Sequence, residues 1–306
     1  MNIQQLEYIL AVDKYRHFAK AAEACHVTQP TLSMMIQKLE EAYQLKIFDR
    51  SRHPVVPTEV GEKLLAQARI ILNEVERFSE IVDRTKNEME GELKVGILPT
   101  IAPYLLPLFL MNFQRKYPAI KLKLAEYVTS TMIEKLQRGE LDAGIMILPE
   151  QHQSLFEVPL YNEPFVIYTP KKYDKQYLLA KDIDPNELLL LEEGHCFRTQ
   201  IIQFCELRRA QENAIEYTSG SLETLRHLAD RHLGITILPA LATWTLSEGQ
   251  QENIKRFAAP QPVRKVSIVT HRDFVKKRFV TLLQQEIQDN LPKDFIDAEG
   301  ITIPLR

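Results

Sequence analysis

Two of the three cysteines in this chain, Cys196 and Cys205, lie only nine positions apart, a spacing at which thiols can do redox chemistry. The segment around them has apolar residues at helical spacing, namely Phe197, Ile201, Phe204 and Leu207. A helix would hold the two Cα atoms roughly 13 Å apart on opposite faces. A disulfide needs them within about 7 Å. The pair can therefore bond only if the helix unwinds, so oxidation would be coupled to refolding.

Cys196 is expected at the start of that helix, where the positive helix end and free backbone N–H groups favour the thiolate. A thiolate attacks the O–O bond of a peroxide and becomes a sulfenic acid, which a second thiol converts into a disulfide. In that chemistry Cys196 would react first and Cys205 would resolve the intermediate. Two alternatives stay open. The cysteines could be structural, or His195 and both thiols could bind a metal, although a fourth ligand at zinc-like spacing is missing.

Further polar side chains follow predicted strands. The segments 93–98, 120–126 and 188–191 read as strands that lead into turns carrying Thr100, Thr129 and His195-Cys196. In an open parallel sheet, ligands bind beyond the carboxyl ends of the strands. We therefore expect these two hydroxyls, the imidazole and the thiol on one rim, where they could hold a peroxide and stabilise the departing oxygen.

The composition of the whole chain is that of a soluble protein, with 306 residues, 45% hydrophobic and 26% charged. The N-terminus has no secretory signal pattern and no stretch is long and apolar enough to span a membrane, which predicts a cytoplasmic protein. A net charge of −3 argues against a globally basic nucleic-acid binder, but residues 14–58 carry seven Lys and Arg against four Asp and Glu. The sequence calls for no cofactor and no metal.

Three segments differ in pattern, and we predict domains at 1–58, 59–90 and 91–306. The first reads as short helices and the second as one long helix. The third alternates strands and helices, which predicts an α/β fold with a mostly parallel sheet. Its further strands are expected at 143–148, 165–169, 215–218, 235–238 and 266–270. Proline-containing stretches near 159–170 and 260–262 predict crossings between subdomain I, 91–161 with 269–306, and subdomain II, 162–268.

The long helix carries an apolar stripe with alternating steps of four and three, formed by Leu64, Ala68, Ile71, Val75, Phe78 and Val82. Such a stripe either packs on its own domain or pairs with a second copy. We favour pairing, which predicts a homodimer.

Residues 18–33 have the profile of a helix-turn-helix. Phe18–Cys25 is a small-residue helix, and Thr28 is a good N-cap for a second helix that begins with Gln29 and Pro30. The second helix of this motif presents its first side chains to bases in the major groove, while cations take phosphates. Cys25 lies among the core positions of the first helix and is expected to be a buried, unreactive residue.

This segment resembles the LysR-type transcription regulators. The resemblance rests on Phe18-x-x-Ala21-Ala22, Val27-Thr28-Gln29-Pro30-Thr31-Leu32-Ser33, Ile36, Leu39-Glu40, Leu45, Phe48-Asp49-Arg50 and Thr58-x-x-Gly61. It implies a winged helix-turn-helix, a dimerising linker helix and a regulatory domain of two Rossmann-like subdomains similar to periplasmic binding proteins. It also implies that double-stranded DNA is contacted by Gln29, Pro30, Thr31, Ser33, Lys38, Arg50 and Arg52.

The C-terminal part resembles the hydrogen-peroxide-sensing members of that family. The shared motifs are Gly194-His-Cys-x-Arg-x-Gln-x-x-x-Phe-Cys205, Gly96-x-x-Pro99-Thr100, Ser221–Arg226 and Gly234–Ala240. The resemblance implies a peroxide pocket of Thr100, Thr129, His195 and Arg264, and a reversible Cys196–Cys205 disulfide. It further implies a homotetrameric activator of oxidative-stress defence genes, with a cellular thiol reductant and RNA polymerase as partners. Thr199 departs from the pattern, because relatives often carry an acidic residue there.

Two other functions remain as alternatives. The chain could be a metabolite-responsive LysR-type regulator whose cysteines are incidental, or a thiol peroxidase that consumes peroxide as a substrate. The helix-turn-helix argues against an enzyme, and the spacing of the cysteines argues against the metabolite sensor.

Overall fold

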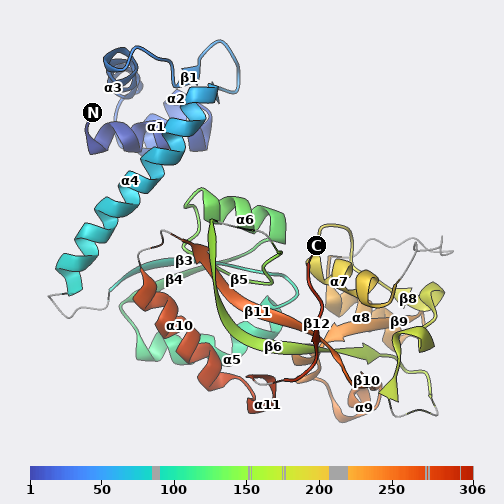
Figure 1. Cartoon of the computed structure of the whole chain (residues 1–306). Helices are drawn as coiled ribbons and strands as arrows, with labels where there is room; N and C mark the ends of the chain where they lie inside the picture. Colours follow the sequence, from blue (N-terminus) through green and yellow to red (C-terminus); the bar gives the residue numbers. More distant parts are fainter. Residues whose placement is uncertain are drawn as a thin grey trace. The chain divides into compact units, whose positions relative to one another are not determined.

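The computed structural model describes residues 1–84, 90–150, 152, 154–173, 175, 177–206, 220–272, 274, 276–296 and 298–305. The chain forms two compact units (Figure 1). The first comprises Met1–Glu88 and Asp273–Lys276, and the second comprises Met89–Arg272 and Lys277–Arg306. The expected strand at 215–218 lies outside the described residues.

The first unit is a small helical domain with a short β-hairpin. Its elements are α1 (Ile3–Tyr15), α2 (Phe18–Ala24), α3 (Gln29–Ala42), β1 (Phe48–Asp49), β2 (Val56–Pro57) and α4 (Glu59–Arg84). Two alanines on α2, Ala21 and Ala22, are almost fully buried, and their small side chains let α2 approach its neighbours closely. The core also contains Ile9, Val12, Leu32 and Ile36.

The start of α4 is fixed against the loop before the hairpin. The hydroxyl of Thr58 donates to the carbonyl oxygen of Lys46 at 2.7 Å and accepts from the N–H of Gly61 at 2.9 Å. A Cβ atom at position 61 would lie 2.0 Å from the carbonyl oxygen of Ile47. Only glycine permits this approach.

The apolar stripe of α4 is divided between two environments. Ala68 belongs to the core of the first unit, and Leu64 and Ile71 pack against that core. Phe78, about two turns beyond Ile71, has 71% of its surface exposed. The first part of the stripe is therefore used within the domain, contrary to the expectation that the whole stripe pairs with a second copy. Packing within the chain prevails there because α1 and α4 are in contact.

The second unit is an α/β domain. Its elements in the first half of the segment are β3 (Gly91–Ile97), α5 (Ala102–Lys116), β4 (Ile120–Glu126), α6 (Thr129–Gln137), β5 (Ala143–Met146), β6 (Leu155–Tyr168), β7 (Tyr177–Leu178), η1 (Ala180–Asp182), η2 (Pro185–Glu187) and β8 (Leu188–Leu189). Those that follow are α7 (Cys196–Phe204), α8 (Leu222–Asp230), β9 (Ile235–Pro239), η3 (Ala240–Thr243), α9 (Glu248–Gln251), β10 (Ile254–Phe257), β11 (Pro262–His271), α10 (Lys277–Asn290), α11 (Lys293–Ile296) and β12 (Ile301–Thr302).

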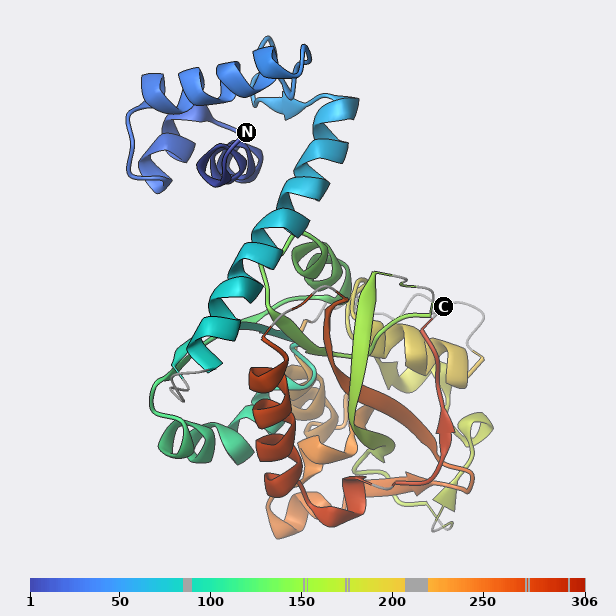
Figure 2. The same cartoon turned by 60° about the vertical axis from the view of Figure 1, so that its left-hand side comes forward.

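The strands form one continuous sheet in the order β4-β3-β5-β11-β6-β10-β7, and β9 also pairs with β6. The long strands β6 and β11 run side by side through the middle of the domain (Figure 2). Residues 155–164 of β6 pair with β11, whereas residues 165–168 pair with β9. Strand β6 therefore serves both halves of the sheet.

The fold class that the sequence predicts, a helix-turn-helix domain followed by an α/β regulatory domain, is confirmed. The expectation of a mostly parallel sheet is wrong in part. Strands β3, β4 and β5 are parallel to one another, but β11 is antiparallel to β5 and β6, and β6 is antiparallel to β9 and β10. The sheet is mixed because β6 and β11, which run side by side through its middle, have opposite directions.

Candidate functional site

The second helix of the first unit presents the residues predicted to face DNA. Thr28 is the N-cap of α3, and its hydroxyl accepts from the N–H of Thr31, as the sequence predicts. The side chains of Gln29, Pro30 and Thr31 are exposed at the start of this helix, and Lys38 is exposed further along it; Ser33 is half-buried. The start of α3 is therefore free to approach a nucleic-acid groove.

Arg50, also predicted to face DNA, makes most of its contacts within the domain. Its guanidinium donates to Glu40 at 3.1 Å and to Ser33 at 3.2 Å, and it lies 4.9 Å from the ring centre of Phe18. Arg52 is more exposed and pairs with Asp49 at 3.3 Å on the hairpin. Arg50 therefore fixes the hairpin to α3, while Arg52 and Lys38 keep their charges at the surface.

Glu40 has a structural role that the sequence motif did not reveal. Its carboxylate is fully buried and accepts from the N–H groups of Ile47 and Phe48 at 2.8 and 3.3 Å. Together with the Arg50 contact, these bonds join α3 to β1.

Cys25 is half-buried at the C-cap of α2 rather than inside the helix, and burial raises the pKa of its thiol.

A buried polar cluster occupies the centre of the second unit. Arg264 of β11 is fully buried; its Nε donates to Glu163 Oε2 at 2.9 Å, and its Nη2 lies 2.7 Å from that carboxylate. Nη1 donates to the hydroxyl of Thr100 at 3.0 Å, and Nη2 donates to the carbonyl oxygen of Thr100 at 2.9 Å. The guanidinium carbon lies 4.8 Å from the ring centre of Phe197, the neighbour of Cys196. The predicted residues Thr100 and Arg264 are therefore in direct contact, and α7 begins beside them.

The contacts of the cluster come from elements far apart in the sequence. Thr100 lies in the turn between β3 and α5, and the antiparallel register places Glu163 of β6 directly opposite Arg264. Glu163 also accepts from the N–H of Leu241 at 3.0 Å. Glu163 had no signal in the sequence, because its pairing depends on the register of two strands about a hundred residues apart.

Thr129 and Cys196 face each other from the first residues of α6 and α7. The Thr129 hydroxyl favours the Cys196 thiolate, yet this buried oxygen makes no hydrogen bond of normal geometry with any described residue. A buried hydroxyl without a partner can donate to a small polar molecule.

Burial dominates the electrostatics of Cys196. Its pKa is raised because the thiol is buried, although Thr129, the charge of Arg264 and the backbone N–H groups at the start of α7 each act to lower it. The start of α7 does favour the thiolate, as the sequence predicts, but desolvation outweighs this effect and the net direction is upward. Cys205 is half-buried, and burial raises its pKa to about 11.

His195 is buried next to Cys196. It is the N-cap residue of α7, and its Nε2 lies 3.7 Å from Glu192 Oε1. Among the described residues, His195 has no hydrogen bond to Thr100, Thr129 or Arg264. The structure thus pairs Thr100 with Arg264 and Thr129 with Cys196, and among the described residues it joins His195 to neither pair by a hydrogen bond.

The two cysteines are at opposite ends of α7. Cys196 is its first residue and Cys205 is its C-cap, and both are free thiols. A helix of this length separates their Cα atoms by roughly 13 Å, beyond the reach of a disulfide. The helix predicted across this segment is confirmed through Phe204; Leu207 lies outside the described residues.

The middle of α7 is tied to the C-terminal segment. Gln200 is fully buried and donates to the carbonyl oxygen of Ile303 at 2.6 Å, while its own Oε1 has no hydrogen-bond partner among the described residues. Ile303 in turn donates from its N–H to Val263, the neighbour of Arg264. The residues that link α7 to β11 in this way were not predicted.

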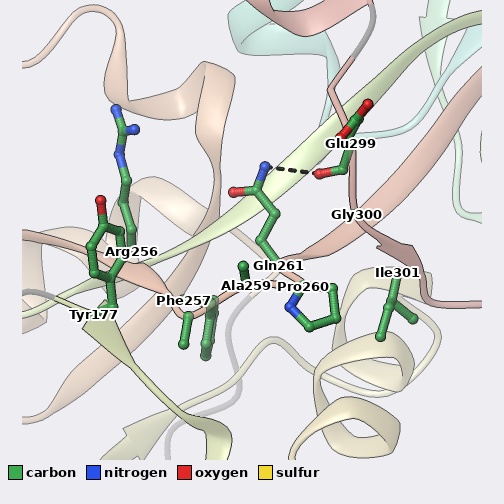
Figure 3. A pocket seen from close by; sticks show the side chains of 10 residues that line it. Tyr177, Arg256, Phe257, Ala259, Pro260, Gln261, Glu299, Gly300 and Ile301 are labelled. Carbon is green, nitrogen blue, oxygen red and sulfur yellow. Dashed lines mark hydrogen bonds between the residues drawn. The ribbon is translucent and has the colours of Figure 1, made fainter.

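A separate surface pocket of about 770 Å³ lies where β7, β10 and the C-terminal segment meet (Figure 3). Its walls include Tyr177, Arg256, Phe257 and Ile301, and Gln261 donates to the carbonyl oxygen of Glu299 across it at 3.1 Å. None of the predicted site residues line this pocket. In the part of the chain that the structure describes, no group of three His, Cys, Asp or Glu side chains comes together as a metal site, and no helix is long and apolar enough to cross a membrane.

A helix-turn-helix domain joined to a two-part α/β domain with a buried polar centre defines a DNA-binding regulator with a sensory domain. Residues 3–62 match the family described as bacterial regulatory helix-turn-helix protein, lysR family, and residues 86–292 match the LysR substrate binding domain. The chain belongs to the LysR family of transcriptional regulators.

Its relatives include the hydrogen peroxide-inducible genes activator of Haemophilus influenzae, which is 35% identical over 274 residues, covering 88% of this chain and 90% of the relative. The DNA-binding transcriptional dual regulator OxyR of Escherichia coli is 38% identical, covering 79% of this chain and 80% of the relative. Among solved structures, a full-length OxyR variant from Pseudomonas aeruginosa matches with a TM-score of 0.79 and 36% identity, covering 94% of this chain and 98% of that one. A hydrogen-peroxide-bound OxyR variant from Corynebacterium glutamicum matches with a TM-score of 0.60 and 26% identity, covering 94% of this chain and 92% of that one.

Proposed function

We propose that this chain is a hydrogen-peroxide-responsive transcription regulator that activates oxidative-stress defence genes and is switched by a reversible Cys196–Cys205 disulfide. One observation carries the proposal: the thiol of Cys196 faces the buried Thr129 hydroxyl, which has no hydrogen-bond partner among the described residues, beside the cluster of Arg264 and Thr100. The names of the relatives in Haemophilus influenzae and Escherichia coli support the same reading.

The chemistry begins at Cys196. Its thiolate attacks one oxygen of hydrogen peroxide, so an S–O bond forms while the O–O bond breaks, and the second oxygen leaves as water with the proton that the thiol released. Thr100 already accepts a hydrogen bond from Arg264, so its own O–H is free to donate elsewhere. In this proposal Thr100, Thr129 and Arg264 hold the peroxide together with His195, which is buried next to Cys196.

The second step forms the disulfide. The Cys205 thiol attacks the sulfenic acid of Cys196, an S–S bond forms, and water leaves. Because α7 holds the two residues roughly 13 Å apart, the helix must unwind first. Unwinding removes Phe197 from the face of Arg264 and Gln200 from Ile303, so it loosens both β11 and the C-terminal segment. A cellular thiol reductant then restores the two thiols.

The DNA-binding part of the proposal rests on the exposed start of α3. Gln29, Pro30, Thr31 and Ser33 would contact base edges and the nearby backbone, and Lys38 and Arg52 would contact phosphates. Arg50 would act mainly by fixing the hairpin to α3, because its guanidinium already donates to Glu40 and Ser33.

The proposed regulator is an oligomer. Dimers through the exposed part of α4 near Phe78, and tetramers through the regulatory domains, would place several α3 helices on one promoter. RNA polymerase is the further partner of an activator, and the site of action is the cytoplasm.

One experiment tests this function. Purified reduced protein is titrated with hydrogen peroxide, the disulfides are mapped by mass spectrometry, and DNA footprints are compared before and after. We expect a Cys196–Cys205 bond and an altered footprint. Cys196→Ser is expected to abolish the response, Cys205→Ser to leave a trappable sulfenic acid, and Cys25→Ser, the matched control, to respond like the unmodified protein.

Three outcomes would contradict the proposal. A Cys196→Ser protein that responds fully would exclude Cys196 as the sensor. An unchanged footprint after oxidation, together with a response to a metabolite, would favour a LysR-type regulator with incidental cysteines. Sustained multiple-turnover consumption of peroxide with a reductant would favour a thiol peroxidase.

A further inference from the structure

The counter-charge of Arg264 is a feature of the buried cluster that peroxide chemistry at Cys196 does not require. Arg264 and Glu163 face each other across β11 and β6, with 0% and 1% of their side-chain surfaces exposed. Two guanidinium nitrogens contact one carboxylate oxygen, at 2.9 and 2.7 Å. In an environment with so little water, the carboxylate cancels much of the field that Arg264 exerts on its surroundings.

The hydrogen bonds of Arg264 leave it little freedom to contact another group. A guanidinium has five N–H donors. One N–H, on Nε, donates to Glu163, and two donate to Thr100, while Nη2 also lies in ion-pair contact with Glu163 at 2.7 Å. Nη1 uses one N–H for Thr100, so its other N–H remains without a partner among the described residues. Glu163 thus fixes both the charge that reaches Cys196 and the direction of the one donor that a peroxide could use.

We propose that Glu163 is a positioning residue that restrains the reactivity of Cys196 by neutralising Arg264 and holding its guanidinium in place. This inference rests on the proposed function. Glu163 touches neither the thiol nor the peroxide. In this proposal it nevertheless helps to set the peroxide concentration at which the sensor responds.

The residues around the Cys196 thiol and around the Glu163 carboxylate agree with the proposed role of Glu163. The groups that act on the Cys196 thiol are Thr129 from α6, Arg264 from β11 and the backbone N–H groups of α7 itself, and all of them favour the thiolate. Burial nevertheless keeps the pKa of the thiol above its ordinary value. Glu163 contacts Arg264 and accepts from the N–H of Leu241, and its negative charge acts to raise the pKa of Tyr104 and of Tyr161.

The substitution Glu163→Gln tests the proposal, because it keeps the size of the side chain and an oxygen that can accept from Nε but removes the negative charge. Alkylation of Cys196 by iodoacetamide is measured across a pH series and quantified on the Cys196 peptide by mass spectrometry, which separates it from Cys25 and Cys205. We expect the pKa of Cys196 to fall by about one unit. The second-order rate with peroxide at pH 7 should rise about threefold, since a tenfold gain in thiolate is partly offset by lower nucleophilicity.

A matched control exists on the same two strands. Glu157 of β6 pairs with Lys265 of β11, but this pair is partly exposed, with 22% and 42% of the side-chain surfaces accessible. Glu157→Gln removes a carboxylate of the same type from the same sheet, and we expect neither the pKa of Cys196 nor the peroxide rate to change. An equal effect of both substitutions would overturn the assignment to Glu163.

Removing one partner of a buried ion pair can prevent folding, so a second variant keeps the proposal testable. The double substitution of Glu163→Gln with Arg264→Gln removes both charges at once. If Glu163 cancels Arg264, the pKa of Cys196 in this variant stays within about half a unit of its original value. A rise of more than one unit would show that Arg264 acts at full strength despite Glu163, and the proposal would be wrong.

The alkylation assay uses no peroxide, so it separates the two claims. A lowered pKa in Glu163→Gln, in a protein that peroxide fails to oxidise, would support the role of Glu163 and contradict the proposed function. An unchanged pKa in a protein that peroxide oxidises normally would overturn the role of Glu163 and leave the sensor intact.

Discussion

The packing of α7 opposes formation of the proposed disulfide, so weakening that packing should make the disulfide more stable. Ile201 lies between the two cysteines and has 2% of its surface exposed in the reduced protein. Replacement Ile201→Val removes one buried methylene group, which costs about 1 kcal/mol in a well-packed core. If α7 unwinds on oxidation, this cost falls on the reduced form alone. For a two-electron couple, 1.4 kcal/mol corresponds to about 30 mV, so the reduction potential should become about 20 mV more negative.

The potential is measured by equilibrating each protein in a series of dithiothreitol redox buffers, quenching with acid and quantifying the Cys196–Cys205 bond by mass spectrometry. Ile287→Val is the control, because Ile287 is also buried but lies in α10, whose main contacts are with α5 and β6. It destabilises both redox forms alike, so its potential should not move. A potential for Ile201→Val that equals that of the control, or is more positive, would refute the claim that α7 loses its packing on oxidation.

Three further predictions follow from the same structure. Because burial raises the pKa of Cys196, the thiolate fraction and hence the stopped-flow peroxide rate should climb with pH between 6 and 8, and a plateau in this range would contradict the raised pKa. Glu40→Gln should lower the free energy of unfolding of the DNA-binding unit by about 1–3 kcal/mol in thermal denaturation, because Glu40 is buried with several donors, whereas the exposed Glu41→Gln should have little effect. Lys38→Ala and Arg52→Ala should each weaken DNA binding on all sequences alike and reduce the salt dependence by about one phosphate contact, and an unchanged slope in a titration by fluorescence anisotropy would exclude that contact.

The sequence predicted the helices and strands whose formation depends on residues that are close together in the chain. The N-cap Thr28 and Pro30 located the start of α3, and the apolar alternation of 120–126 matched β4 at both ends. The alternation of strands and helices gave the α/β class. The exposure of Gln29, Pro30 and Thr31 followed from their place at the start of α3.

Features that depend on contacts between residues far apart in the chain could not be predicted from the sequence. Glu163 and Gln200 find their partners only through strand register and the return of the C-terminal segment to α7. The pKa of Cys196 depends on how much water the fold removes, which a position at a helix start does not reveal. The stripe of α4 likewise did not show that Ala68 and its neighbours pack on their own domain.

The central claim is that the two sulfur atoms can meet only when α7 loses its helical structure. Hydrogen–deuterium exchange of the reduced and peroxide-treated protein, followed on the peptides that cover 197–204 and 301–305, measures this directly. The account predicts that amide protection in both segments falls once the Cys196–Cys205 bond has formed. A fully formed bond with unchanged protection across 197–204 would contradict it.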